Sequence, residues 1–237
     1  DLVRSRGLGD VYKRQILGYL CINLEYQQYP TIGAFRRTPV AVQMTLEEFQ
    51  QRDHAPTLDG REVGALVTVP AAPMRDAYAY VPPAYWQGAT LPVMVLLSGS
   101  PGSPMGWFTD GQADDIADAY QAEHGGASPI VVGVDGTGST TGNPACVDGP
   151  QLQMQTYLAE DIPALIKETF RVNQDQHTWT IGGLSYGGTC SLQVVANAPE
   201  SYGTFLDFSG EPEPSLGSHD KTVNETVSYT HLTLPTK

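Results

Sequence analysis

Basic residues, cysteines and long apolar runs are all scarce in this sequence of 237 residues. The 13 Lys and Arg residues stand against 26 Asp and Glu residues, which gives a net charge of −13. Nucleic acids and anionic membrane surfaces are bound by clustered positive charge, so this acidity argues against both as partners. The simplest interpretation of the acidity is that it keeps the protein soluble.

The three cysteines, Cys21, Cys146 and Cys190, form no CxxC or other metal-ligand spacing, and the five histidines are scattered. We therefore expect no metal and no cofactor. The sequence alone leaves open whether Cys146 and Cys190 pair in an exported protein. The apolar stretch 16–22 is far shorter than the ~20 residues of a membrane helix, so it is either a short buried segment or the end of a membrane or signal segment.

The two ends of the chain differ from its middle. Residues 1–15 carry four basic side chains without helical or strand periodicity, and residues 227–237 follow abruptly on an amphipathic stretch. Both resemble translated sequencing-adapter segments, so we interpret them as non-native and exclude them from the fold. The rest divides into a lead-in over 16–60, where the end of a membrane or signal segment would lie, and one domain over 61–226.

Strand patterns begin after residue 60. Residues 62–69 and 76–81 each stop at a proline and predict an antiparallel pair at a sheet edge, where proline is tolerated. The solid apolar runs 91–97 and 130–134 predict parallel strands that are buried on both faces. Before residue 60 the one regular pattern is a short helix over 45–52, opened by a capping box.

Helical patterns separate the later strands. A helix over 110–124 presents an apolar face formed by Ile116, Ala117 and Tyr120. A helix over 153–170 contains Pro163, which predicts a kink or a restart because proline removes a backbone donor. Short strands at 178–181 and 204–208 flank a third helix, so strands and helices alternate. This order predicts a doubly wound, mostly parallel α/β sheet with right-handed crossovers.

The stretch GLSYG at 183–187 fits G-x-S-x-G and lies between a predicted strand and a predicted helix. Such a turn is so sharp that small residues, Gly183 and Gly187, must flank the serine. The turn lifts the serine hydroxyl above the sheet and points the next helix's N-terminus at any oxyanion formed there. We interpret Ser185 as a nucleophile and the Tyr186 backbone N–H as an oxyanion donor; the alternative is a turn without chemistry.

A second oxyanion donor is expected from a loop after an earlier strand. Residues 98–104 (SGSPGSP) follow the strand predicted over 91–97. Gly99 allows close approach of the backbone to a substrate, and Ser100 offers the N–H, since neither proline of the loop can donate. The alternative is a flexible surface loop.

The glycine-rich stretch 135–142 (DGTGSTTG) also follows a predicted strand. No helix opens directly after it and it has no Walker lysine, so phosphate binding has no physical basis there. Because it leaves the carboxyl end of a strand, we expect it to lie near the mouth of the site.

Three stretches together resemble a known family: LLSGSPGSPMGWF at 96–108, QTYLAEDIPALI at 155–166 and TIGGLSYGGTCSLQVVANAPESYGTFLDFSG at 180–210. They are similar to the putative esterase family, which is related to esterase D and to the mycolyltransferases of the antigen 85 type. YPTIGAF at 29–35 also looks like the segment after the membrane portion of exported actinobacterial members.

The resemblance implies an α/β-hydrolase fold, with Ser185 as the nucleophile and the backbones of Tyr186 and Ser100 as the oxyanion hole. The implied activity is hydrolysis of a carboxylic ester or acyl transfer from it, through an acyl-serine. Small-molecule, lipid or sugar esters are the expected substrates. The implied location is outside the cell or in the cell envelope, where a membrane-anchored full-length protein would also lie.

In α/β-hydrolases the triad follows the chain order Ser, Asp or Glu, His. Between Ser185 and residue 226 the sequence holds only one more helix, one strand and the start of another helix. The two further strands that normally precede the triad acid and the triad histidine are not found there. Glu211, Glu213 and His219 lie close in sequence, but a histidine at this point is not expected to reach the serine. His231 lies in the adapter-like tail.

We therefore predict that this chain is a fragment of an exported serine esterase or acyltransferase that lacks its acid and its histidine. By itself it would be a very poor catalyst. The alternative is a non-catalytic binding or structural module of the cell envelope that keeps the same fold.

Overall fold

The computed structural model describes residues 13–15, 17, 18, 20, 21, 38–150 and 152–226. The chain divides into two units, Asp1–Pro39 and Val40–Lys237, and the described residues before 22 are helical. Within the described residues, no helix has the length and apolar character needed to cross a membrane. The YPTIGAF stretch at 29–35 and the residues 227–237 lie outside the described part.

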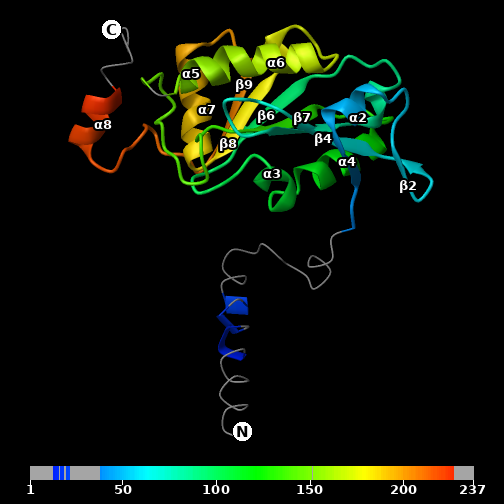
Figure 1. Cartoon of the computed structure of the whole chain (residues 1–237), viewed down its shortest axis with the longest axis horizontal. Coiled ribbons are helices and arrows are strands. Elements are labelled where there is room, and N and C mark those ends of the chain that lie inside the picture. The colour runs from blue at the N-terminus through cyan, green and yellow to red at the C-terminus, as the bar shows by residue number, and fades with distance from the viewer. Residues whose placement is uncertain (1–12, 16, 19, 22–37, 151, 227–237) are drawn as a thin grey trace, which may run out of the picture. The chain divides into compact units, whose positions relative to one another are not determined.

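The second unit is built on a seven-stranded sheet with the order β1-β4-β5-β7-β6-β8-β9 (Figure 1). These strands are β1 (Ala41–Thr45), β4 (Gly64–Val69), β5 (Ala77–Val81), β6 (Val93–Leu97), β7 (Ile130–Val134), β8 (Thr180–Leu184) and β9 (Thr204–Phe208). Strand β5 is antiparallel to both neighbours, while the remaining adjacent pairs are parallel. The carboxyl ends of β6, β7, β8 and β9 therefore meet at one edge of the sheet. A separate small hairpin joins β2 (Thr57–Leu58) to β3 (Arg61–Glu62).

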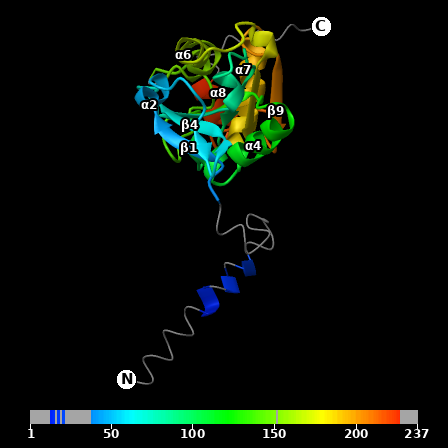
Figure 2. The ribbon, with the colours of Figure 1, turned by 90° about the vertical axis from the view of Figure 1, so that its right-hand side faces the viewer.

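Helices cover both faces of the sheet (Figures 1 and 2). One face carries α2 (Leu46–Gln50), α5 (Met154–Thr156), the π-helical turn η3 (Tyr157–Asp161), α6 (Ile162–Thr169) and α7 (Tyr186–Asn197). The opposite face carries α3 (Gly106–Thr109) and α4 (Ala113–Glu123). The short 3₁₀ turns η2 (Pro83–Tyr85) and η4 (Gln176–Thr178) lie in connections, and α8 (His219–Thr226) follows β9.

The buried side chains of the central strands alternate between two cores. Val95 and Leu97 of β6 belong to the larger core, on the side of α6 and α7, whereas Leu96 belongs to the smaller core, on the side of α3 and α4. Because each face is packed against helices, an apolar residue is favoured at every position. The prediction of doubly covered strands at 91–97 and 130–134 is therefore confirmed.

The predicted edge pair at 62–69 and 76–81 is antiparallel as expected, but it does not lie at the edge. Strand β1, which the sequence analysis missed, pairs in parallel with β4 and forms the edge itself. Pro70 and Pro82 directly follow the last residues of β4 and β5, so neither interrupts the ladder. Their presence therefore did not require an edge position. Strand β1 is short and half-exposed, which explains its weak pattern.

Two predictions about helices are confirmed in detail. At the start of α2, Thr45 Oγ1 accepts the Glu48 backbone N–H at 3.2 Å, while Glu48 Oε2 accepts the Thr45 N–H at 2.8 Å, which completes the predicted capping box. The restart predicted at Pro163 occurs where the π-helical turn η3 gives way to α6.

The predicted apolar face of the 110–124 helix is only partly buried. In α4, Ala117 packs into the smaller core, but Ile116 and Tyr120 are 67% and 50% exposed. They line an open apolar groove of about 370 Å³ together with residues of β6, β7 and β9.

Candidate active site

Ser185 stands between the end of β8 and the start of α7, at the sheet edge where the parallel strands end. Its backbone has φ 54° and ψ −118°, which non-glycine residues rarely adopt. The surroundings fix this conformation: the Ser185 N–H donates to the Phe208 carbonyl at 2.8 Å, and the Ser185 carbonyl accepts the Gly188 N–H at 2.9 Å. Backbone strain held in this way is typical of functional turns.

The two glycines of the motif are required by close packing of backbones. A Cβ on Gly183 would overlap the backbone of Gly187. A Cβ on Gly187 would lie 2.7 Å from the Leu97 carbonyl carbon and 2.8 Å from the Ser98 carbonyl oxygen. Any side chain at either position would thus push α7 away from β8 or β6. This packing supplies a physical reason for the glycine spacing around Ser185.

Residues 98–104, here called the oxyanion loop, pass directly beside Ser185. A Cβ placed on Gly99 would lie 3.3 Å from the Leu184 carbonyl oxygen and 3.5 Å from Ser185 Cβ. The structure thus brings Ser100, Ser185 and Tyr186 together at one cavity of about 360 Å³. The other residues that line this cavity include Asn143, Ala145, Cys146, Thr189, Glu211, Glu213 and Leu216.

The loop after β7 is anchored by a buried ion pair. Asp135 is fully buried, and its carboxylate accepts hydrogen bonds from Arg75 Nε at 2.8 Å and Arg75 Nη2 at 2.7 Å. Burial alone would raise the pKa of Asp135, but hydrogen bonds from Arg75 and from the Thr137 backbone outweigh it, so its pKa lies below the ordinary value. Asp135 therefore stays charged and holds the start of this loop.

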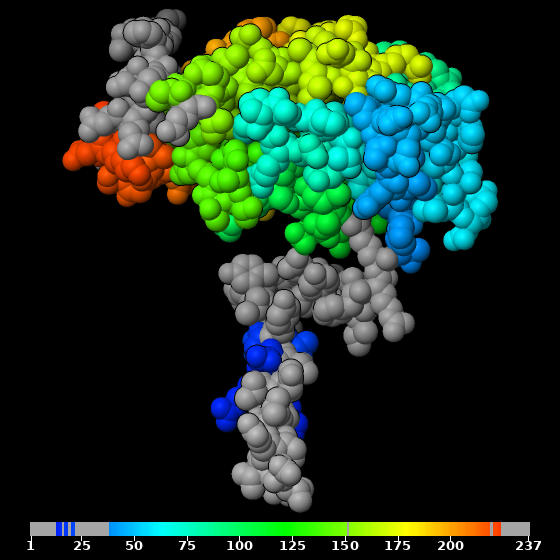
Figure 3. Space-filling model, in the orientation of Figure 1, coloured from blue at the N-terminus to red at the C-terminus, as the bar shows by residue number. Residues whose placement is uncertain are grey.

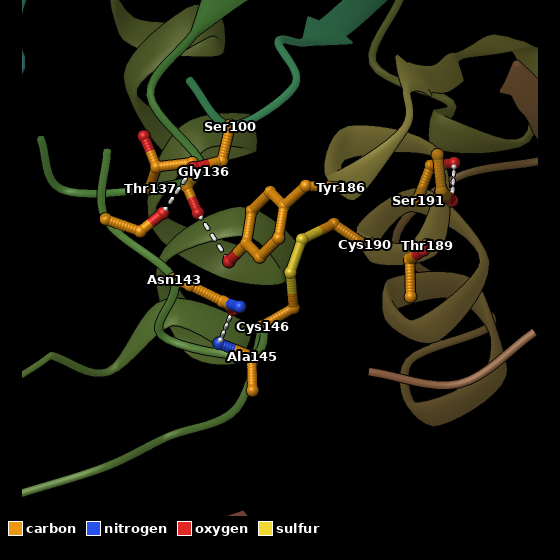
Figure 4. Close-up of a disulfide and its surroundings, with 12 residues drawn as sticks. Ser100, Gly136, Thr137, Asn143, Ala145, Cys146, Tyr186, Thr189, Cys190 and Ser191 are labelled. Carbon is orange, nitrogen blue, oxygen red and sulfur yellow. Dashed lines mark hydrogen bonds between the residues drawn. A yellow bond between two sulfur atoms is a disulfide. The ribbon is translucent and has the colours of Figure 1, made fainter. Parts of the chain in front are cut away.

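A disulfide joins Cys146 of the same loop to Cys190 of α7, with their Cα atoms 5.5 Å apart (Figure 4). One turn earlier on α7, the Tyr186 hydroxyl donates to the Gly136 carbonyl at 2.9 Å. Burial raises the pKa of Tyr186 well above its ordinary value, so the phenol stays protonated and keeps this donor.

The segment that follows β9 closes the cavity on another side. The Thr189 hydroxyl accepts the Glu211 N–H at 2.8 Å, and Asn143 Nδ2 donates to the Ser215 carbonyl at 2.9 Å. Figure 3 shows the orange-to-red C-terminal segment beside the green surface of the residues that follow β7. Glu211 and Glu213 thus line the cavity at Ser185, while His219 begins α8 and its side chain lies outside the described part of the structure.

Among the side chains that the structure describes, which do not include that of His219, no hydrogen bond joins Ser185 Oγ to a histidine ring or to a carboxylate. Nor do the described His, Cys, Asp and Glu side chains form a group of three or more that could hold a metal ion. The assignment of Ser185, Tyr186 and Ser100 to a catalytic site stays a prediction.

Sequence reasoning missed several residues of the site. Asn143 and Thr189 line the cavity, and Arg75 holds the loop after β7 from a position 60 residues earlier in the chain. One signal was present, since Asp135 directly follows the apolar run 130–134 and a charge at that point needs a partner. The sequence did not indicate which basic residue supplies it.

Comparison with known proteins places these features in context. The family model described as "Putative esterase" matches residues 74–231. An uncharacterized protein of Corynebacterium glutamicum is 57% identical over 216 residues, covering 86% of this chain and 51% of that protein. The chain thus spans about half the length of this curated relative.

Two solved structures share the fold at low sequence identity. A ferulic acid esterase of Anaeromyces mucronatus is 18% identical with a TM-score of 0.53, over 71% of this chain and 70% of that one. An S-formylglutathione hydrolase from Agrobacterium tumefaciens is 22% identical with a TM-score of 0.52, over 63% of this chain and 58% of that one. Together with the family match, this likeness confirms the predicted α/β-hydrolase fold.

Proposed function

Because the chain belongs to the putative esterase family, we propose that it forms the nucleophile-bearing part of a serine carboxylic-ester hydrolase or acyltransferase. The observation that carries the proposal is the conformation of Ser185. A serine held at φ 54° and ψ −118° between two backbone-packed glycines, at the N-terminus of α7 and beside the oxyanion loop, is arranged as a nucleophile elbow is.

In the proposed reaction, Ser185 Oγ attacks the ester carbonyl carbon and loses its proton to a general base. The negative charge that develops on the carbonyl oxygen is stabilised by the backbone N–H groups of Tyr186 and Ser100 and by the N-terminus of α7. The ester C–O bond then breaks, the alcohol leaves with a proton, and an acyl-serine remains. Water as the acceptor gives hydrolysis, and another hydroxyl compound gives acyl transfer.

The general base and its acid partner are proposed to lie outside the described residues. Two observations support this proposal: Ser185 Oγ has no histidine or carboxylate partner among the side chains that the structure describes, and the chain spans about half the length of its curated relative. By itself, this chain is therefore proposed to be a very poor catalyst.

The cavity walls suggest the kind of ester. Polar groups of Asn143, Thr189, Glu211 and Glu213 line it, which favours a polar alcohol or acceptor such as a sugar over an entirely apolar one. The solved structures named above are a ferulic acid esterase and an S-formylglutathione hydrolase by their titles. Among the small-molecule, lipid and sugar esters expected from the sequence, an ester of a sugar or another polar alcohol is accordingly proposed as the substrate.

We propose an extracellular or cell-envelope location, with membrane anchoring of the full-length protein as a further expectation. The disulfide between Cys146 and Cys190 supports it, because disulfides persist in oxidising compartments and are rare in the cytosol.

Labelling with a fluorophosphonate probe tests the proposed nucleophile. In the full-length protein, Ser185 should be labelled and a Ser185→Ala variant should not be. In the present chain, aryl-ester turnover should be close to that of its Ser185→Ala variant. Serine-dependent turnover at the rate of ordinary esterases would contradict the proposal that a base is missing.

The competing function is a non-catalytic module of the cell envelope. It is favoured by the same observation that Ser185 Oγ has no base among the side chains that the structure describes. Absence of probe labelling in the folded full-length protein would support this function and reject the esterase.

A further inference from the structure

We propose that residues 135–146, here called the bridging loop, position the oxyanion hole, and that the disulfide between Cys146 and Cys190 locks them in place. The inference rests on the proposed function, because an oxyanion hole matters only if Ser185 attacks an ester. It assigns a role to contacts that the proposed reaction does not itself use.

The two proposed donors lie on different elements. The Tyr186 N–H belongs to the first turn of α7, and the Ser100 N–H belongs to the oxyanion loop, 86 positions earlier in the sequence. Both must point at one oxygen atom from about 2.7–3.1 Å, so their relative placement has to be fixed to a fraction of an ångström. The bridging loop makes contacts with both elements.

On one side the bridging loop binds the oxyanion loop through two hydrogen bonds. Ser100 Oγ donates to the Gly142 carbonyl at 3.0 Å, and the Gly102 N–H donates to the Thr140 carbonyl at 2.9 Å. These bonds hold the Ser100 side chain and the backbone two residues after it, so they restrict where the Ser100 N–H can point.

On the other side the bridging loop binds the first turns of α7 (Figure 4). Tyr186 and Cys190 are four residues apart and therefore share one face of the helix. Tyr186 donates to the Gly136 carbonyl, and Cys190 is bonded to Cys146. The bridging loop thus holds the side chain of Tyr186, whose N–H is one proposed donor, and also the oxyanion loop, which supplies the other donor from Ser100.

The end of the bridging loop has an unfavourable backbone conformation. Ala145 and Cys146 have φ 53° and 55°, in the left-handed region that favours glycine. Asn143 Oδ1 accepts the Ala145 N–H at 3.1 Å, and the disulfide holds Cys146. Without the disulfide, Cys146 would lose the covalent restraint that holds it in that region.

Arg75 fixes the other end of the bridging loop. Besides its two guanidinium bonds to Asp135, it donates from Nη1 to the Gly102 carbonyl at 3.0 Å and from Nη2 to Thr137 Oγ1 at 2.8 Å. One guanidinium therefore joins the bridging loop to the oxyanion loop. We assign Arg75, Tyr186 and Cys190 as positioning residues through these contacts.

Hydrogen–deuterium exchange measured by mass spectrometry tests this coupling without requiring activity. A Cys146→Ser/Cys190→Ser variant should exchange about tenfold faster or more in peptides covering 98–104 and 135–148, with unchanged exchange in 64–81 of the sheet. Cys21→Ser, which removes the exposed free cysteine, is the matched control and should exchange as the wild type does. Alkylation of the unreduced protein should modify Cys21 alone.

Three results would overturn the inference. The first is alkylation of all three cysteines without reductant. The second is faster exchange in 135–148 but not in 98–104, which would confine the disulfide to a local role. The third is a uniform increase that includes 64–81, which would mean a general loss of stability. A Tyr186→Phe variant, which removes only the hydroxyl donor, should show the same pattern more weakly and covers the case in which the double variant unfolds.

The rate of fluorophosphonate labelling in the full-length protein separates this inference from the proposed function. If the wild type is labelled at Ser185 and the double cysteine variant is labelled about tenfold more slowly, the result supports both the proposed function and the positioning role of the bridging loop. If the wild type is not labelled, the esterase proposal fails while the exchange experiment still decides the coupling. Equal labelling of wild type and variant would reject the positioning role alone.

Discussion

Replacing Gly187 by alanine should destabilise the protein, although alanine is the better helix former. Gly187 is the second residue of α7, where its backbone lies against β6. An added Cβ would stand 2.7 Å from the Leu97 carbonyl carbon and 2.8 Å from the Ser98 carbonyl oxygen. These neighbours are backbone atoms of a central strand and the residue after it, so no side-chain rotation can relieve the contact.

The magnitude follows from this overlap. Non-bonded carbon atoms pack best at about 3.5 Å or more, so α7 or β6 would have to shift by about 0.8 Å. Forcing extra atoms into a packed interior costs roughly 1–3 kcal/mol, and the upper part of this range applies where backbone must move. The higher helix propensity of alanine offsets at most about 1 kcal/mol of this destabilisation. We expect a net loss of about 2 kcal/mol in the free energy of unfolding.

Urea unfolding followed by circular dichroism measures this loss. With a slope of about 2 kcal/mol per molar urea, the midpoint of Gly187→Ala should fall by about 1 M. Gly136→Ala is the matched control in the same site, since the nearest atom to its Cβ would be Leu97 Cδ2 at 3.7 Å, and its midpoint should change little. Equal midpoints for the two variants would refute the packing explanation of the motif glycine.

Three further outcomes follow from other contacts. The pKa of Asp135 in the folded protein lies below its ordinary value of 3.8. The stability that this shift contributes is present above pH 3.8 and is lost as the pH falls through the lower folded-state pKa. Urea midpoints measured from pH 7 to 3 should therefore fall more steeply for wild type than for Asp135→Asn. Thr45→Ala should cost about 1 kcal/mol in urea unfolding through loss of the capping box, and no change would mean that α2 is held by packing alone. Phe49→Ala should lower the free energy of unfolding by about 3–5 kcal/mol, because the ring is 4% exposed and packs against three other aromatic rings. The control Glu47→Ala, on the exposed face of the same helix, should lower it by less than about 0.5 kcal/mol.

The central sheet and the tight turn at Ser185 could be predicted because their causes are local in sequence. The apolar runs 91–97 and 130–134 indicate strands that are buried on both faces. The glycines around Ser185 indicate a turn in which the backbone packs directly against neighbouring backbone. Each cause acts within a few residues, so a pattern in one short stretch is enough.

The supports of the site depend instead on partners that are distant in sequence. Arg75 meets Asp135 across 60 residues, and Cys146 meets Cys190 across 44. The charge of Asp135 shows that a partner is needed without showing which residue supplies it, and the sequence named Cys146 and Cys190 as a candidate pair without showing whether they bond. Strand β1 was missed for a related reason. Its residues form a strand because they pair with β4, while their half-exposed sequence carries no clear strand pattern.

The carboxyl ends of β6, β7, β8 and β9 meet at one edge, so the candidate site consists of four connections that a common sheet holds in place. A connection can lengthen or change composition without disturbing the ladder that precedes it. Sequence changes in the connections after β7 and β9 would therefore alter the walls of the cavity while the serine turn stays fixed. Divergence among relatives should accumulate in those two connections before it reaches the strands.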